Sequence, residues 1–298
     1  LHDPQYLEYE KTFYPFILFG KKKYVGNKYE HDVNTYKQTA MGIVLKRRDN
    51  APIVKIVFGD IIDSIMTSKK IKPSLELLNN NLKKLIAGEY GLDMLTITKT
   101  LSSYYKEPDR VAHKVLAERI GERDPGSKPQ VNDRVPFIYI ETTGKVKLQG
   151  DRIEHPSFIR EHNLKPDYEF YITNQIMKPV CQIYALSLEN LPGYTEQMNV
   201  FGHMYEKYVK QGKLPHKAIK LVLEKKQKVA SNLIFGDILR ETRNKRLGNN
   251  EITKWFMQKN IITTTSKKKA KNKLHTSSKI LNKDYDSDFE SEDYDSDE

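Results

Sequence analysis

The chain has 298 residues and a formal net charge of +11 that is unevenly distributed, because residues 284–298 contain nine acids and no Lys or Arg, which leaves +20 on the rest. A body this basic repels itself unless a polyanion offsets its field, so the charge favours nucleic acid as a partner, with an anionic membrane surface as the competing class. The composition excludes a membrane-spanning helix, since no apolar run approaches the roughly 20 residues required, and the single cysteine, Cys181, excludes an internal disulfide framework and a four-cysteine metal site.

The cysteine count also indicates the compartment in which the protein works. A single cysteine fits a reducing, intracellular compartment, and no signal peptide opens the chain. No basic amphipathic helix with a wide apolar face supports the membrane alternative. Because the chain begins with Leu1 in place of Met, we expect it to be processed or part of something longer.

The first predicted elements form a β-hairpin. Residues 13–19 are rich in aromatic and branched side chains, which is typical of a strand, and Gly20 ends it. Residues 24–25 can pair back across a lysine triplet, and residues 36–39 add a third short strand. The triplet consists of Lys21, Lys22 and Lys23, and it is closed by Tyr24.

Beyond residue 51 the apolar residues change to helical spacing. The positions from Val54 to Met66 predict an amphipathic helix, and Pro73 begins a second one. A link is expected at 94–98, then a helix at 112–120 that is ended by Gly121 and the turn at 124–126, and a strand at 135–140. Two further helices are expected at 156–161 and 168–176, and Pro179 closes the second. A helical extension is expected between 199 and 255, and it includes 216–226 and 230–243.

The end of the chain has a different composition. Residues 267–273 contain five lysines, and an acidic run with Ser287, Ser291 and Ser296 follows. Such a segment cannot bury enough apolar surface to offset its ordering entropy, so residues 263–298 are predicted to be disordered. The lysine run is interpreted as a nuclear localisation signal, a segment that binds nucleic acid, or a solvated linker. The three serines are interpreted as phosphorylation sites for an acid-directed kinase.

One stretch resembles a catalytic loop. Residues 58–64, FGDIIDS, resemble a loop that presents two metal-binding carboxylates, but Asp60 and Asp63 are three residues apart in place of two. The surrounding period also places them on the polar side of a helix, whereas two-metal catalysis gathers its oxygen ligands around the ions. We therefore reject this stretch, and the similar run at 235–237, as a metal site.

The other reactive side chains are isolated in the sequence. There is no Gly-rich phosphate loop, no His-Glu-x-x-His and no Gly-x-Ser-x-Gly motif. Cys181 lies in an apolar stretch and is interpreted as a buried residue that packs in the core. The scattered histidines are interpreted as surface or core-edge residues: His113, His155 and His162. We predict no catalytic and no metal-ligating residue in this chain.

Binding signals are stronger than catalytic ones. Lysines beside Tyr24 on a hairpin offer point charges for phosphates and donors for base edges, while the ring can pack on a sugar. In the minor groove such donors meet acceptors that recur at every base pair, so they sense pairing shape without reading sequence. Arg47 and Arg48 add forked donors for phosphates, and Asp49 can orient one of them. A solvated basic hairpin with a local ion pair stays open as the alternative on these residues alone.

Five runs occur in the order and spacing of one protein family. They are YPFILFGKKKYVG (14–26), GIVLKRRDNAPIV (42–54), LTITKTL (95–101), AHKVLAERIGERDPGSKPQVNDRVPFIYI (112–140) and the weaker YITNQIMKPVCQIY (171–184). With these runs the chain resembles the C-terminal part of a family B DNA polymerase, and it is most similar to the eukaryotic delta-type enzymes and to those of large DNA viruses. The resemblance covers roughly residues 1–185.

The resemblance implies an α+β fold class. A short β-hairpin would finish the palm, a mostly α-helical thumb would grip the new duplex, and a helical extension and the disordered charged tail would follow. The implied boundaries are 1–50 for the end of the palm, 51–185 for the thumb, 186–262 for the extension and 263–298 for the tail.

The resemblance also implies DNA-binding residues. The lysine–tyrosine motif would touch the minor groove and backbone at the primer end, here Lys21, Lys22, Lys23 and Tyr24. The Arg-Arg-Asp motif would help to hold the primer strand, here Arg47, Arg48 and Asp49. Lys99 and the loop from Arg123 to Arg134 would meet backbone phosphates, and Gly126 would allow a tight turn in that loop.

The implied activity is DNA-directed nucleotidyl transfer by a longer or split enzyme. Two Mg²⁺ ions would be bound by residues upstream of Leu1, so this chain alone is expected to be inactive. The implied partners are primer–template DNA, the upstream palm, fingers and exonuclease portion, and by analogy a sliding clamp, at a nuclear or cytoplasmic viral replication site.

Two departures from the family and one alternative qualify the resemblance. Met41-Gly42 stands where the family usually has Lys-Gly, so one backbone contact is expected to be lost. The cysteine clusters that end delta-type enzymes are missing, so their metal and their mode of partner binding are not carried over. The alternative function is a stand-alone, non-catalytic duplex-binding module or a split polymerase subunit.

Overall fold

The computed structural model describes residues 10–246, apart from 31, 33, 143, 145, 147 and 196–199. The chain divides into two compact units, residues 1–243 and 244–298, and the description that follows concerns the first. The predicted disordered tail, with its lysine run and its three serines, lies outside the described residues, as do residues 247–262 of the predicted extension.

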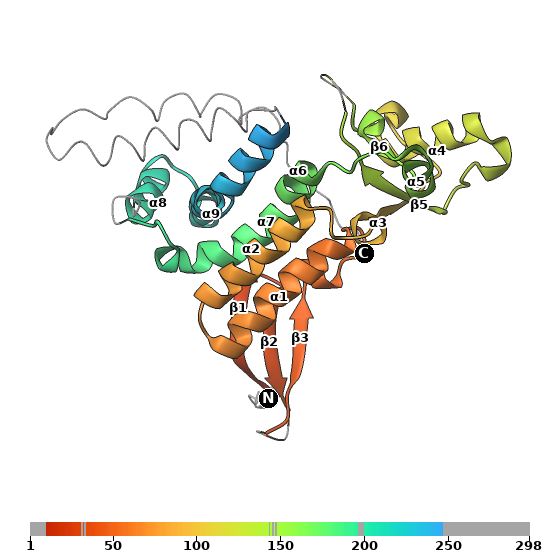
Figure 1. Cartoon of the computed structure of the whole chain (residues 1–298). Helices are drawn as coiled ribbons and strands as arrows, with labels where there is room; N and C mark the ends of the chain where they lie inside the picture. The colour runs from red at the N-terminus through yellow and green to blue at the C-terminus, as the bar shows by residue number, and fades with distance from the viewer. Residues whose placement is uncertain are drawn as a thin grey trace, which may run out of the picture. The chain divides into compact units, whose positions relative to one another are not determined.

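The predicted hairpin is present as part of a three-stranded antiparallel sheet (Figure 1). Strands β1 (Thr12–Gly20), β2 (Lys23–Tyr29) and β3 (Lys37–Met41) follow one another in chain order. Leu18 pairs with Tyr24, and Tyr24 pairs with Met41. The third strand expected near residues 36–39 is therefore confirmed, and Lys21 and Lys22 form the turn between β1 and β2.

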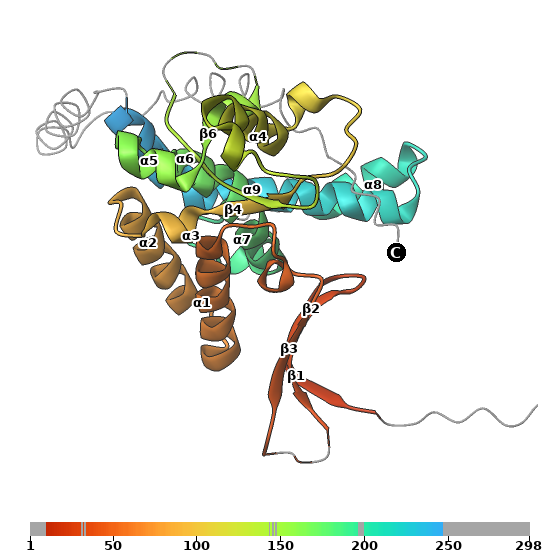
Figure 2. The ribbon, with the colours of Figure 1, turned by 90° about the vertical axis from the view of Figure 1, so that its right-hand side faces the viewer.

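The two amphipathic helices predicted after residue 51 are confirmed as α1 (Pro52–Ser68) and α2 (Lys72–Ile86). Helix α1 lies against one face of the sheet, as Figures 1 and 2 show from two directions. Phe19 of β1 contacts Phe58 of α1, with 6.3 Å between ring centroids, and Gln38 of β3 donates to Asp63. The buried face of α1 consists of Ile53, Val54, Val57, Phe58, Ile61, Ile62 and Met66.

A second antiparallel sheet corrects the interpretation of residues 94–98 as a link. Helix α3 (Leu92–Leu95) ends there and strand β4 (Ile97–Thr100) begins. Strand β4 pairs with β5 (Arg134–Tyr139), which pairs with β6 (Ile153–Glu154). The partner strand is more than 30 residues away, so the local pattern of residues 94–98 could not indicate the pairing.

Helix α4 (Ala112–Arg123) continues past Gly121, which was expected to end it. The chain leaves the helix at Asp124, whose extended backbone begins a 3-10 turn, η3 (Pro125–Ser127). At Gly121 an added Cβ would lie 2.7 Å from Cδ of Lys128. This glycine therefore leaves room for the side chain of Lys128 against the helix.

Pro179 does not close the helix that begins at residue 168, contrary to expectation. Helix α6 (Tyr168–Phe170) continues through a π-helical segment (Tyr171–Ile176) into α7 (Met177–Tyr184). A proline inside an α-helix collides with the carbonyl four residues earlier, and the wider π-helical turn changes where that carbonyl lies. The chain can therefore pass Pro179 without ending the helix.

The predicted extension is helical in its described residues. Helix α8 (Phe201–Lys210) precedes α9 (Pro215–Arg246), so the segments expected at 216–226 and 230–243 form one continuous helix. Within residues 10–246 as described, no helix is long and apolar enough to cross a membrane. The other short elements are helix α5 (Pro156–His162) and the 3-10 helices η1 (Val44–Lys46), η2 (Pro108–Arg110), η4 (Gln149–Arg152) and η6 (Ala185–Asn190).

Candidate nucleic-acid interface

The lysine triplet is exposed at the turn of the first sheet. Lys21 and Lys22 make the turn and Lys23 begins β2, and all three side chains face solvent. Gly42 lies directly behind them with φ of +63°, and an added Cβ would be 2.2 Å from the carbonyl oxygen of Lys22. Because only glycine fits so close to another backbone, this contact fixes the lysine turn against the segment that leads to Arg47.

Tyr24 lies on the face of the sheet that α1 does not cover. Its ring is 5.7 Å from that of Phe13 and 5.5 Å from that of Phe16. The ring is half-buried among these aromatic residues, so the packing of Tyr24 on a sugar stays a prediction.

Arg47, Asp49 and Lys99 come together in one ion cluster. Asp49 accepts from Nε and Nη2 of Arg47 at 3.0 and 2.9 Å, and from Nζ of Lys99 at 3.5 Å. The hydrogen bonds from Arg47 and the charge of Lys99 outweigh partial burial and lower the pKa of Asp49 to about 2. The carboxylate is therefore ionised at neutral pH and orients both cations at one place on the surface.

Arg48 and Arg134 meet beside this cluster. Nη2 of Arg134 donates to Oγ1 of Thr98 at 2.6 Å, to the carbonyl oxygen of Thr98 at 3.3 Å and to that of Arg48 at 3.4 Å. An open pocket of about 420 Å³ lies next to them, and we call it the basic pocket. It is lined by Arg48, Asn50, Pro52, Lys55, Asp93, Thr96, Thr98 and Arg134.

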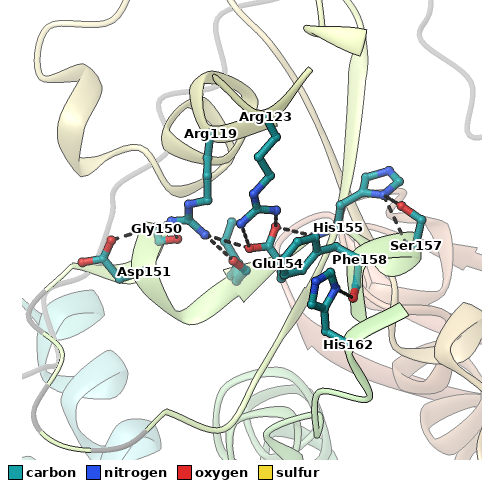
Figure 3. A network of polar contacts seen from close by, with 10 residues as sticks. Arg119, Arg123, Gly150, Asp151, Glu154, His155, Ser157, Phe158 and His162 are labelled. Carbon is teal, nitrogen blue, oxygen red and sulfur yellow. Dashed lines mark hydrogen bonds and ion pairs between the residues drawn. The ribbon is translucent and has the colours of Figure 1, made fainter. Parts of the chain in front are cut away.

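Arg123 lies in a different environment from the other predicted arginines (Figure 3). It forms two bonds to the buried carboxylate of Glu154, at 3.0 and 2.9 Å, and its guanidinium lies 3.7 Å from the ring of Phe158. Arg119 binds the same carboxylate at 3.1 Å. We call Arg119, Arg123 and Glu154 the Glu154 cluster. The predicted phosphate contact of Arg123 is therefore in competition with an internal partner.

The pKa of Glu154 reflects these opposing effects. Burial by itself would raise it, but the bonds from Arg123, from the backbone N–H of His155 and from Arg119 lower it below the usual value. Glu154 therefore remains charged although its side chain is almost fully buried.

Gly126 lies in the turn after α4, but its conformation does not demand glycine. The carboxylate of Asp124 accepts from the backbone N–H of Gly126 at 3.0 Å, and an added Cβ would meet only that carboxylate oxygen, at 3.4 Å. Its φ is not in the left-handed region, so the turn is stabilised by Asp124 rather than by the freedom of a glycine.

The rejected metal stretches have structural partners. Asp60 and Asp63 lie in α1, where Asp60 accepts from Asn81 at 2.8 Å, and Asp237 pairs with Arg240 in α9. Among the described residues, no group of three His, Cys, Asp or Glu side chains could hold a metal ion. The Mg²⁺ ions implied by the resemblance were expected to be bound by residues upstream of Leu1, and the carboxylates of these two stretches are held by Asn81, Gln38 and Arg240.

The histidines and the cysteine take structural positions. His113 contacts the hydroxyl of Tyr105 at 3.0 Å, and His162 stacks on Phe158 with 3.8 Å between centroids. His155 caps the start of α5. Cys181 is buried, and this burial raises the pKa of its thiol to about 12, so it is not an activated nucleophile.

Sequence reasoning missed three residues that complete the basic surface. Gly42 positions the lysine turn, Thr98 anchors Arg134, and Lys55 adds a charge to the basic pocket. Gly42 was named from the sequence only within the Met41-Gly42 departure from the family, without a role in positioning the lysines. Nothing in the local pattern marked Thr98 or Lys55.

Comparisons with known proteins agree with the resemblance. Residues 1–186 match the family described as DNA polymerase family B. A DNA polymerase of Pyramimonas orientalis virus is 53% identical over 263 residues, covering 86% of this chain and 21% of the viral protein. A DNA polymerase of Acanthamoeba polyphaga mimivirus is 53% identical over 191 residues, covering 62% of this chain and 11% of the viral protein. The DNA polymerase delta catalytic subunit of Glycine max is 34% identical over 188 residues, covering 63% of this chain and 17% of the plant protein.

Two facts follow from the extent of these matches. The chain spans between 11% and 21% of the length of these relatives. The match to the Pyramimonas orientalis virus protein is also longer than residues 1–186, so it includes part of the helical extension, beyond the roughly 185 residues of the expected resemblance.

Proposed function

This chain belongs to DNA polymerase family B, and from that premise we propose that it is the C-terminal portion of a DNA-directed DNA polymerase that holds the primer–template duplex. One observation carries the proposal. The segment 47–49 meets Lys99 of β4 through Asp49, 50 positions away, and Arg134 of β5 through Arg48, 86 positions away, so cations from distant parts of the sequence gather on one surface. Such convergence suits the phosphates of a nucleic-acid strand.

The geometry supports a positioning role. Asp49 holds the forked guanidinium of Arg47 in one orientation, and Lys99 adds a point charge beside it. A cation held in place loses less conformational entropy when it binds a phosphate than a freely rotating one. Placement of the primer end in the correct geometry can supply a large part of a rate enhancement, and the chemical step would be carried out by residues elsewhere in the polymerase.

The lysine turn would contact the duplex next to this surface. Lys21, Lys22 and Lys23 are exposed and Gly42 lies against their turn, so they present donors from the end of the β1–β2 hairpin. Arg123 is left out of the proposed interface, because Glu154 and Phe158 occupy its guanidinium.

The rest of the polymerase is proposed to pack on the uncovered face of the first sheet. Phe16, Leu18 and Met41 are exposed there beside Tyr24, while Ile17 and Phe19 pack against the core on the other face. A contiguous apolar patch of this kind marks an interaction surface. The proposed setting is an intracellular site of DNA replication.

Binding by the chain itself is the first test. Fluorescence anisotropy should show tighter binding to a primer–template duplex than to a single strand, and with on the order of six phosphate contacts the log–log salt dependence should have a slope of about −5. Lys22→Ala should weaken binding, whereas Lys84→Ala on α2 is the matched control, since Lys84 is also exposed and lies outside the proposed surface. A slope near zero would contradict the proposal.

A second measurement separates a polymerase part from a duplex-binding module. In the intact polymerase, Lys22→Ala should lower primer extension more than it lowers DNA affinity, because a displaced primer end reacts slowly even when bound. Equal losses in both quantities would favour the non-catalytic binding module.

A further inference from the structure

The hydroxyl of Tyr171 lies between the backbones of two neighbouring segments. Strands β4 and β5 pair Ile97 with Phe137, and the same register continued by two residues sets Leu95 opposite Tyr139. At this position the hydroxyl donates to the carbonyl oxygen of Leu95 at 2.6 Å and accepts from the backbone N–H of Tyr139 at 3.2 Å. A side chain from α6 and the π-helical segment therefore bridges the two backbones where β4 begins.

Packing alone does not require this hydroxyl. The ring of Tyr171 is fully buried and meets that of Phe170 edge to face, with 5.8 Å between centroids. A phenylalanine would fill nearly the same volume, whereas a buried hydroxyl is unfavourable unless it is hydrogen-bonded. Burial raises the pKa of Tyr171, so the hydroxyl keeps its proton and donates. The bridge is therefore the contribution that only the hydroxyl makes.

The start of α6 holds β5 from the other side of the same residue. The backbone N–H of Asp167 donates to the carbonyl oxygen of Tyr139 at 2.9 Å, and the Asp167 carboxylate accepts from the backbone N–H of Phe170 at 3.0 Å. The rings of Tyr139 and Phe170 are stacked, with 3.4 Å between centroids. Tyr171 follows directly as the first residue of the π-helical segment, a geometry that is frequent at functional sites.

The two bridged strands carry the cations of the proposed interface. Lys99 follows Leu95 by four residues and Arg134 precedes Tyr139 by five, so both lie within about 17 Å of the bridge along the chain. The contact between Nζ of Lys99 and Asp49 is 3.5 Å, longer than the roughly 2.9 Å of a usual hydrogen bond. A small displacement of β4 therefore separates Lys99 from the carboxylate.

We propose that Tyr171 is a positioning residue for primer extension: its hydroxyl sets the position of β4 against β5 and so keeps Lys99 beside Asp49. This inference rests on the proposed function and adds to it a residue that itself touches no DNA. Without the hydroxyl, Leu95 and Tyr139 can approach as a direct backbone pair, and this approach changes where β4 presents Lys99.

The test compares two hydroxyl deletions in the intact polymerase. Tyr171→Phe should slow primer extension about ten-fold while DNA affinity stays within about two-fold and the salt slope is unchanged, because every cation is retained. Tyr184→Phe is the matched control, since Tyr184 is also fully buried and its hydroxyl contacts Oγ of Ser74 at 2.9 Å, between α7 and α2. The control should lose comparable thermal stability and keep its extension rate. A wild-type rate for Tyr171→Phe, or equal losses of rate in both variants, overturns the inference.

A double-mutant cycle asks whether Tyr171 acts through Lys99. The double variant Tyr171→Phe with Lys99→Ala should extend primers as slowly as Lys99→Ala alone, whereas multiplied losses overturn the proposed route. If Lys22→Ala and Lys99→Ala change neither affinity nor extension, the proposed function fails and this inference fails with it. If both lower these quantities and Tyr171→Phe does not lower extension, only this inference fails.

Hydrogen exchange in the unsubstituted chain tests the bridge without a variant. The amide of Tyr139 should exchange as slowly as the amides of the residues of β5 that are paired with β4, because the Tyr171 hydroxyl accepts its N–H. Exchange at the rate of an exposed loop amide overturns the inference, whatever the folding of the Tyr171→Phe variant.

Discussion

Arg123 and Arg134 come from the same basic loop of the sequence, yet they end in opposite surroundings. Arg123 shares the buried carboxylate of Glu154 with Arg119, and its guanidinium covers Phe158. Arg134 is anchored by uncharged oxygens. It lies beside Arg48 and Lys55, and neither of these has a carboxylate partner among the described residues. The Glu154 cluster therefore uses arginine charge to hold α4 against β6, whereas Arg134 lines the basic pocket without a carboxylate bound to it. Counting cations in a motif cannot make this distinction, because the compensating carboxylate lies elsewhere in the chain.

The largest expected effect is on the Glu154 cluster. Glu154→Ala removes the buried carboxylate from two partly buried guanidinium groups and leaves only the exposed Asp151 beside Arg119, which should destabilise the fold by about 3 kcal/mol. Urea unfolding followed by circular dichroism measures this loss. Asp151→Asn is the control, because Asp151 is exposed and lies 3.7 Å from Arg119, and a surface pair of this kind contributes less than about 1 kcal/mol. A comparable loss in both variants would show that the buried carboxylate has no special role.

Acid should act on the same cluster. Because the folded pKa of Glu154 lies below its ordinary value of 4.5, its contribution to stability is fully present above that pH and is lost as the pH falls through the folded pKa. Unfolding free energies measured from pH 7 down to pH 3 should therefore fall more steeply for the wild type than for Glu154→Gln. Parallel curves would mean that another carboxylate controls acid unfolding.

The smallest effect on stability is expected at Asp49, whose carboxylate pairs with cations, as Glu154 does, but is partly exposed. Asp49 pairs with Arg47 and Lys99, but all three side chains are partly exposed, so Asp49→Asn should change stability by less than about 1 kcal/mol. Removal of one negative charge should leave DNA affinity equal or about two-fold tighter, while primer extension by the intact polymerase falls because Arg47 is no longer oriented. A parallel fall of affinity and extension would show that Asp49 builds the surface rather than orients it.

The sequence by itself determined the elements whose signal is local. The aromatic and branched composition of residues 13–19 gave the first hairpin, and 3.6-residue patterns gave α1 and α2, since such a pattern states which face of a helix is apolar. The ion pair of Arg47 and Asp49 was also predictable, because the two residues are two positions apart. The ordered motifs further indicated the family to which residues 1–186 belong.

Only the tertiary structure decided which distant groups meet. The pairing of β4 with β5, the capture of Arg123 by a carboxylate 31 residues away, and the convergence of Lys55, Thr98 and Arg134 all depend on how the elements pack. The passage of the helix through Pro179 depended on a π-helical segment that periodicity does not reveal. A local pattern determines which face of one element points toward the core. The partner of a charged side chain depends on which residues, distant in the sequence, lie next to it once the elements have packed.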